Sequence, residues 1–118
     1  MNLIEIYKHE KEGYDPSFIS DGWQVAFLNY AEAETLECIE KLDIHYLTDE
    51  VFVLLNGTAV LIAADIQDNQ ISYDLINMQP GIIYNIPKNT WHKIAMYEGS
   101  KVCIVEKTNT HLGDFEFY

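Results

Sequence analysis

Two histidines and two carboxylates are the side chains in this sequence whose types and spacing could do chemistry. Asp43 and His45 stand two residues apart, and Glu50 follows His45 after four intervening residues. His92 comes much later in the chain. Two imidazoles and one carboxylate that converge hold Fe(II) and related divalent metals and leave coordination positions open. The spacing alone does not bring the histidines together, so the elements that carry them decide whether such a site exists.

The local pattern places these side chains on predicted strands. If residues 46–49 form a hairpin turn, His45 and Glu50 fall near each other across the two strands. Side chains two apart on a strand share a face, so Asp43 points to the same side as His45 and is a candidate fourth ligand. His92 begins another predicted strand, directly after a proline-containing turn. The four side chains are therefore candidates for one metal centre.

Most of the chain reads as short strands separated by turns. Apolar runs rich in Val, Ile, Leu, Tyr and Phe recur at intervals of about ten residues, a spacing typical of an all-β sandwich or barrel. Segment 31–41 also has helix propensity, but the pattern that follows it favours a strand. The predicted strands cover residues 3–7, 22–31, 36–46, 50–56, 58–65, 71–77, 81–86, 92–98 and 101–107.

Turn residues separate these runs. Asn56-Gly57 lies between two apolar runs and predicts a two-residue hairpin turn that needs positive φ. Asp68-Asn69 predicts a second hairpin turn. Asp15-Pro16 and Gln79-Pro80-Gly81 are predicted to be turns as well.

The predicted strand over residues 50–56 is apolar on both faces. If Glu50 points inward, Phe52 and Leu54 share its face. The opposite face carries Val51, Val53 and Leu55. In a small barrel the cover for an apolar outer face must come from another part of the chain or from another subunit, so we expect a homodimer.

Length and charge narrow the class of protein. The 118 residues amount to one domain, expected to span residues 1–118, and a hydrophobic share of 48% supports a real core. The net charge is −12, from 19 acidic against 7 basic side chains. Such a surface repels phosphate backbones and anionic headgroups, so we expect neither a nucleic-acid partner nor a membrane partner.

The cysteines and the N-terminal residues provide information about the cellular location of the protein. Cys38 and Cys103 are far apart and form neither a disulfide framework nor a zinc-ligand pair. Cys103 lies in an apolar run and is expected to be a buried, inert thiol. Residues 1–12 are charged throughout and lack a signal-peptide apolar stretch, so we expect a cytoplasmic location.

Two motifs resemble those of the cupin superfamily. The first reads Glu37, five residues, Asp43-Ile44-His45, four residues, Glu50, six residues, Gly57. In cupins the corresponding positions hold a glycine, a His-X-His, a glutamate and a glycine at matching spacing. Asp43 therefore stands where the family has its first histidine.

The second motif reads Gly81, five residues, Pro87-Lys88-Asn89, two residues, His92, three residues, Met96. The family has a glycine at the position of Asn89 and an asparagine at the position of Met96. Asn tolerates the left-handed conformation, so the turn can survive. Met96 is expected to replace a polar group of the pocket wall by an adaptable apolar one.

The resemblance implies an all-β, single-domain cupin: a double-stranded β-helix, or jelly-roll barrel. It implies that His45, Glu50 and His92 are metal ligands and catalytic residues, with Asp43 as a possible further ligand. The cofactor would be a divalent metal ion, and Fe, Mn, Ni, Zn and Co are not distinguished. The partner would be a small-molecule ligand.

Three functions remain open. The first is a metal-dependent enzyme, an oxygenase, isomerase or lyase, acting on a small organic or sugar-like substrate. The second is a domain that binds a small ligand such as a sugar without turning it over. The third is a metal-independent enzyme resembling the nucleotide-sugar isomerases and epimerases, with histidine as general base. The few basic residues argue against the third function, because a pyrophosphate needs them. After position 50 they are Lys88, Lys93, Lys101 and Lys107.

Overall fold

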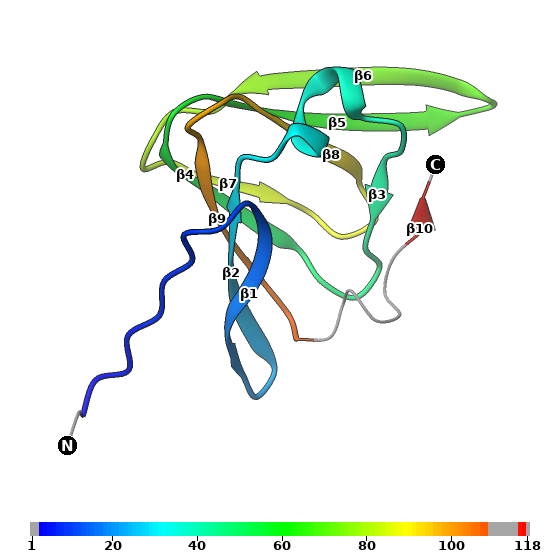
Figure 1. Cartoon of the computed structure of the whole chain (residues 1–118). Coiled ribbons are helices and arrows are strands. Elements are labelled where there is room, and N and C mark those ends of the chain that lie inside the picture. The colour runs from blue at the N-terminus through cyan, green and yellow to red at the C-terminus, as the bar shows by residue number, and fades with distance from the viewer. Residues whose placement is uncertain (1–2, 109–115, 118) are drawn as a thin grey trace.

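Two antiparallel sheets face each other across the core in the computed structural model, which describes residues 3–108 and the backbone of 116–117 (Figure 1). One sheet, called sheet A, has the strand order β1-β2-β9-β4-β7, and the other, sheet B, has the order β10-β3-β8-β5-β6. This architecture confirms the all-β prediction. The strands are β1 (Gly13–Ser20), β2 (Trp23–Asn29), β3 (Asp43–Ile44), β4 (Glu50–Asn56), β5 (Ala59–Gln67), β6 (Gln70–Asn77), β7 (Ile83–Ile86), β8 (Trp91–Met96), β9 (Lys101–Glu106) and β10 (Glu116–Phe117).

The core forms between the sheets from the inward positions of alternating strands. Ala26 on β2, Leu54 on β4 and Val102 on β9 have no exposed surface. Glu50 and Phe52 share the inward face of β4 with Leu54, as predicted, and are almost completely buried. The same alternation that builds the apolar core thus turns a carboxylate toward the interior of the barrel.

The outer face of sheet A is apolar as well. The register aligns Val25, Val105 and Val51 in one row across three neighbouring strands. A second row, made of side chains that are all partly or largely exposed, holds Phe27, Cys103, Val53 and Ile83. Cys103 was expected to be buried, but it is only partly buried, because its strand turns it to this outer face. Even this partial burial raises the pKa of the thiol.

Gly57 forms a corner between the two sheets, and the hairpin predicted at Asn56-Gly57 is wrong. The flanking strands β4 and β5 do not pair with each other, because β4 belongs to sheet A and β5 to sheet B. Gly57 has φ +81°, and a Cβ added there would lie 2.7 Å from the Cα of Ser100. The glycine is therefore needed for both its conformation and its close packing.

Gly57→Ala is expected to lower the free energy of unfolding by about 2–4 kcal/mol, since it adds a backbone clash to the strain of positive φ. Gly81→Ala is the matched control: Gly81 has φ +79°, and a Cβ there meets nothing within 4 Å. Gly81→Ala should lower the free energy of unfolding by only about 1 kcal/mol. Denaturant unfolding of the two variants measures the difference, and equal losses would contradict the corner packing.

Of the other turn predictions, two are confirmed and one is wrong. Asp68-Asn69 joins β5 to β6 in a hairpin, with φ of 51° and 64°, as predicted. Gln79-Pro80-Gly81 is also a turn. Asp15-Pro16 is not a separate turn but lies inside β1, at a register shift between Asp15 and Phe18. Proline is tolerated there because β1 is an edge strand.

Two predicted strands are wrong. Residues 3–7 form no strand; they belong to an arm that extends away from the barrel (Figure 1), and Leu3, Ile4 and Ile6 are largely exposed. Apolar alternation there lacks a neighbouring strand to complete its hydrogen bonds. The predicted strand 36–46 retains only the two residues of β3. Before it stand two short 3₁₀ helices, η1 (Glu32–Glu34) and η2 (Leu36–Cys38).

Candidate metal centre

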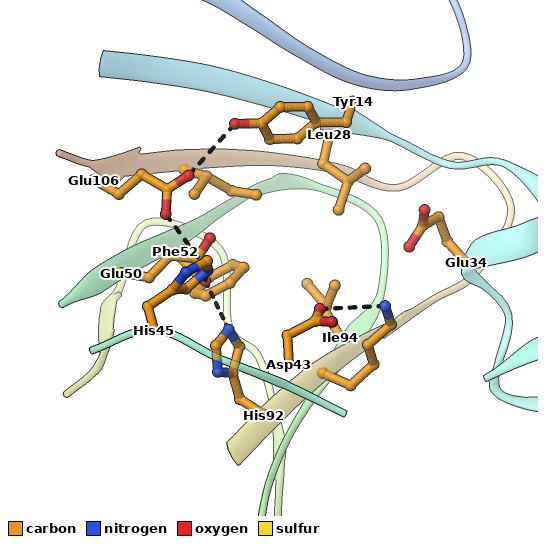
Figure 2. A pocket seen from close by; sticks show the side chains of 12 residues that line it. Tyr14, Leu28, Glu34, Asp43, His45, Glu50, Phe52, His92, Ile94 and Glu106 are labelled. Atoms are coloured by element: carbon orange, nitrogen blue, oxygen red, sulfur yellow. Dashed lines mark hydrogen bonds and ion pairs between the residues drawn. The ribbon is translucent and has the colours of Figure 1, made fainter. Parts of the chain in front are cut away.

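His45, Glu50 and His92 come together inside one end of the barrel (Figure 2). His45 directly follows β3, Glu50 opens β4, and His92 is the second residue of β8. The Nε2 atom of His92 lies 2.7 Å from Oε1 of Glu50, and Nε2 of His45 lies 3.8 Å from the same oxygen. Ligand atoms from all three lie within 4.8 Å of one another.

The loop that carries His45 is tied to the turn before His92. The backbone N–H of Asn89 donates to the carbonyl of His45 at 2.7 Å, and Asn89 has φ 69°, the left-handed conformation expected of it. Asp49 accepts the backbone N–H of Lys88 at 2.9 Å, which holds the pKa of this carboxyl below its usual range. These bonds bring two segments together that lie far apart in the sequence.

His45 and Glu50 do not face each other across a hairpin, as the sequence had suggested. Strands β3 and β4 lie in different sheets, so residues 46–49 are a crossing between sheets. The two side chains still meet, because both point into the barrel from opposite walls (Figure 2). The expected proximity is confirmed, although its cause is different.

The backbone fixes the orientation of His92. Its Nδ1 lies 2.9 Å from the carbonyl oxygen of Thr90, which can only accept, so Nδ1 carries a proton. Nε2 is thereby aimed at Glu50. Burial lowers the pKa of His92, but the hydrogen bond and charge of Glu50 and the bond to Thr90 outweigh burial and raise it above its usual value. The geometry at Nε2 suits either a proton or a metal ion.

Asp43 lies in the same pocket but outside the group formed by the other three. Its Oδ2 accepts from the ammonium of Lys93 at 3.3 Å, and both side chains are 27% exposed. Glu34 of η1 lines the pocket beside them (Figure 2), and burial raises the pKa of this carboxyl. The charge of Asp43 is therefore balanced locally by a lysine.

These side chains line a cavity of about 200 Å³. Its floor is apolar and consists of Leu28, Phe52, Ile94 and Ile104. Met96, expected in the pocket wall, belongs instead to the hydrophobic core, with 1% of its surface exposed. Methionine in place of the motif's asparagine at position 96 therefore affects the packing of the core and not the polar groups of the pocket.

A second carboxylate and its donors were missed by sequence reasoning. Glu106 at the end of β9 is 7% exposed, and its Oε2 lies 3.9 Å from Nε2 of His45. Tyr14 and Gln24 both donate to its Oε1 at 3.4 Å. Burial, followed by the charges of Glu106 and Glu50, raises the pKa of Tyr14 well above its usual range, so the phenol stays protonated.

One signal could have found Glu106. It alternates with Val102 and Ile104, and both are buried, so the strand period places a carboxylate at an inward position. Gln24 had the same signal, because it alternates with the buried Ala26 and Leu28 in the predicted strand 22–31. Tyr14 had none, because the strand that holds it was not predicted.

The donor set fits a divalent metal ion. Ligands bonded to one ion at about 2.1 Å lie about 3–4 Å apart, and the distances from Glu50 to the two imidazoles are near this range. His45, Glu50 and His92 would hold the ion. A bound ion of this kind polarises a substrate oxygen or, if it is iron, activates dioxygen.

Solved structures with the same architecture decide the fold. An RmlC-like cupin family protein from Methanocaldococcus jannaschii, with a double-stranded β-helix fold, matches with a TM-score of 0.61 and 14% sequence identity. The match covers 91% of this chain and 92% of that chain. This chain has the cupin fold. No family model matches its sequence.

Two enzymes are similar to this chain. The 3,4-ketoisomerase QdtA from Thermoanaerobacterium thermosaccharolyticum matches with a TM-score of 0.61 and 19% identity, over 78% of this chain and 63% of that one. Acireductone dioxygenase from Exiguobacterium sibiricum is 34% identical over 61 residues. These residues are 52% of this chain but span only about a third, 32%, of the relative.

The comparisons leave the cellular location open. In the part of the chain that the structure describes, no helix is long and apolar enough to cross a membrane.

Proposed function

We propose that this cupin holds one divalent metal ion on His45, Glu50 and His92 and is an enzyme acting on a small organic or sugar-like substrate. The observation that carries the proposal is the convergence of these three side chains, with ligand atoms within 4.8 Å of one another, at the wall of a pocket. The similarity to acireductone dioxygenase and to a ketoisomerase supports an enzymatic role.

Different pocket residues would contact different parts of a substrate. The apolar floor, which includes Phe52 and Ile94, would pack against the carbon skeleton of the substrate and exclude water. Lys93 provides an ammonium donor at the pocket wall, whereas the hydroxyl proton of Tyr14 is donated to Glu106. A cavity of about 200 Å³ limits the bound part of the substrate to a small molecule.

Metal content tests the metal centre. The protein is purified without chelators, stripped, and reconstituted separately with Fe²⁺, Mn²⁺, Co²⁺, Ni²⁺ and Zn²⁺. We expect a full equivalent of at least one metal to remain after gel filtration. Less than stoichiometric retention of every metal would contradict the proposal. Turnover is then assayed with the metal that is retained, and binding of a sugar or sugar-like acid without turnover would favour the non-catalytic alternative.

A nucleotide-sugar isomerase is the second candidate, because the QdtA structure was solved with TDP-4-keto-6-deoxyglucose. Two features of the pocket weigh against it. Lys93 is the only lysine or arginine among the residues that line the described cavity, and Asp43 already pairs with it. Thermal unfolding with and without TDP discriminates: stabilisation by TDP that does not need metal would favour the second candidate.

We also propose that the protein is a cytoplasmic homodimer whose copies meet through the outer face of sheet A. Two free thiols support the compartment. Outward positions of β2, β9 and β4 hold none of the 19 acidic residues. Two chains of net charge −12 repel each other least where faces without acidic side chains meet, and the paired face would bury the apolar rows.

Val53→Glu is expected to convert this dimer to a monomer, because it places a charge in the middle of the apolar face. The control is Tyr73→Glu on β6, where an exposed aromatic side chain lies outside sheet A. Sedimentation equilibrium measures both variants, and circular dichroism checks their folding. A monomeric parent protein, or equal behaviour of the two variants, would contradict the proposed interface.

A further inference from the structure

Glu106 lies beside His45 in the same pocket, although, like Asp43, it is outside the group of three side chains whose ligand atoms lie within 4.8 Å of one another (Figure 2). Its Oε2 is 3.9 Å from Nε2 of His45, a separation that two ligands of one ion with bonds of about 2.1 Å can have. The site then draws His92 from sheet B, His45 from the loop that follows β3, and two carboxylates, Glu50 and Glu106, from sheet A. An ion between them would contact both walls of the barrel.

Neighbouring side chains hold the Glu106 carboxylate in the orientation of a ligand. Tyr14 and Gln24 both donate to Oε1, and Gln24 also donates to the Tyr14 hydroxyl at 2.9 Å. Because both donors engage Oε1, Oε2 is turned toward His45. Hydrogen bonds to one oxygen of a carboxylate commonly orient the other toward a metal.

Charge balance favours the same assignment. Imidazoles that bind a metal through Nε2 are neutral, so His45 and His92 would contribute no charge. One divalent ion held by Glu50 alone leaves a net positive charge in a nearly buried site, whereas Glu50 and Glu106 together neutralise it. The side chains of these two glutamates are only 10% and 4% exposed.

Asp43 is the rival for the fourth position, since it occupies the place of the first histidine in the cupin motif. Its Oδ2 is engaged by Lys93 at 3.3 Å, and the resulting ion pair is already neutral. Asp43 could bind a metal through Oδ1, which has no hydrogen-bond partner, but its single negative charge would then be shared between the ion and the ammonium of Lys93. Glu106 is held through Oε1 by two neutral donors, Tyr14 and Gln24, and its Oε2 faces His45.

We propose that Glu106 is the fourth protein ligand, so that the metal is held by two histidines and two carboxylates. This inference rests on the proposed metal centre. Since carboxylate oxygen favours harder ions than imidazole does, the site should favour Mn²⁺ and Fe²⁺ more than a site with three histidines and one carboxylate would.

Metal binding by two isosteric variants tests the assignment. Mn²⁺ is titrated by calorimetry into the chelator-stripped parent protein, Glu106→Gln and Asp43→Asn. Loss of a charged ligand should weaken Mn²⁺ binding by at least about 30-fold in Glu106→Gln, while Asp43→Asn should stay within about threefold of the parent. Co²⁺ is the spectroscopic probe: its d–d absorption should change in Glu106→Gln and stay unchanged in Asp43→Asn.

The outcomes distinguish failure of the Glu106 assignment from failure of the proposed metal centre. If the parent binds no Mn²⁺ or Co²⁺, the metal centre itself fails. If the parent binds and Glu106→Gln matches it in affinity and spectrum, or if Asp43→Asn alone loses the ion, the assignment of Glu106 is overturned. Circular dichroism and thermal unfolding check each metal-free variant. Glu106→Asp, which keeps the charge, provides a second variant and should bind more tightly than Glu106→Gln.

Discussion

His92→Gln is expected to weaken divalent-metal binding by about 1,000-fold or more, since it removes a ligand whose orientation the protein has already fixed. The carbonyl of Thr90 accepts a hydrogen bond from Nδ1–H, which aims Nε2 at Glu50, and the ring is nearly buried. Glutamine cannot supply an imidazole nitrogen there. Calorimetric titration of stripped protein with Mn²⁺ and Co²⁺ measures the loss.

His9→Gln is the control for this prediction. The His9 side chain is also mostly buried, 12% exposed, and its Nε2 approaches the carbonyl of Gly13 at 3.1 Å, but it lies outside the cavity. It should bind metal like the parent protein. Equal loss in the two variants would mean that metal binding reports on overall folding, and unchanged binding in His92→Gln would remove His92 from the proposed centre.

The accuracy of the sequence predictions follows the range of the interactions behind them. The Asp68-Asn69 hairpin depends on two residues that tolerate positive φ, and it was predictable. Asn56-Gly57 has an equally strong local signal but forms a corner, because β4 finds β7 and β9 as partners instead of β5. Local turn chemistry specifies a reversal of the chain and leaves open which sheet the next strand enters.

The site shows the same division between local and distant interactions. His45, Glu50 and His92 could be predicted because two spaced motifs carry them. Glu106 enters from β9 and pairs with groups more than eighty positions away, Tyr14 and Gln24, so its role depends on barrel closure. Pairings between residues so distant in sequence are set by sheet order, which a single sequence does not display.

The two sheets contribute different chemistry to the proposed centre. Sheet B supplies the imidazole of His92, and His45 follows its strand β3; sheet A supplies Glu50 and Glu106. At this point a hydrogen bond of 2.7 Å between Nε2 of His92 and Oε1 of Glu50 joins the two sheets. A metal bound to both walls would replace one contact by several bonds, so metal binding should stabilise the folded barrel.

Metal removal is therefore expected to lower the stability of the parent protein by about 4 kcal/mol when the free metal concentration had been about 1,000 times the dissociation constant. For a domain of this size the loss corresponds to about 15 °C in the midpoint of thermal unfolding. Calorimetric scans of stripped and reconstituted protein measure the shift. His92→Gln should shift by no more than about 2 °C, because at the same metal concentration its roughly 1,000-fold weaker site is at most about half occupied. An equal metal-dependent shift in the parent and in His92→Gln would place the stabilising ion elsewhere on the chain.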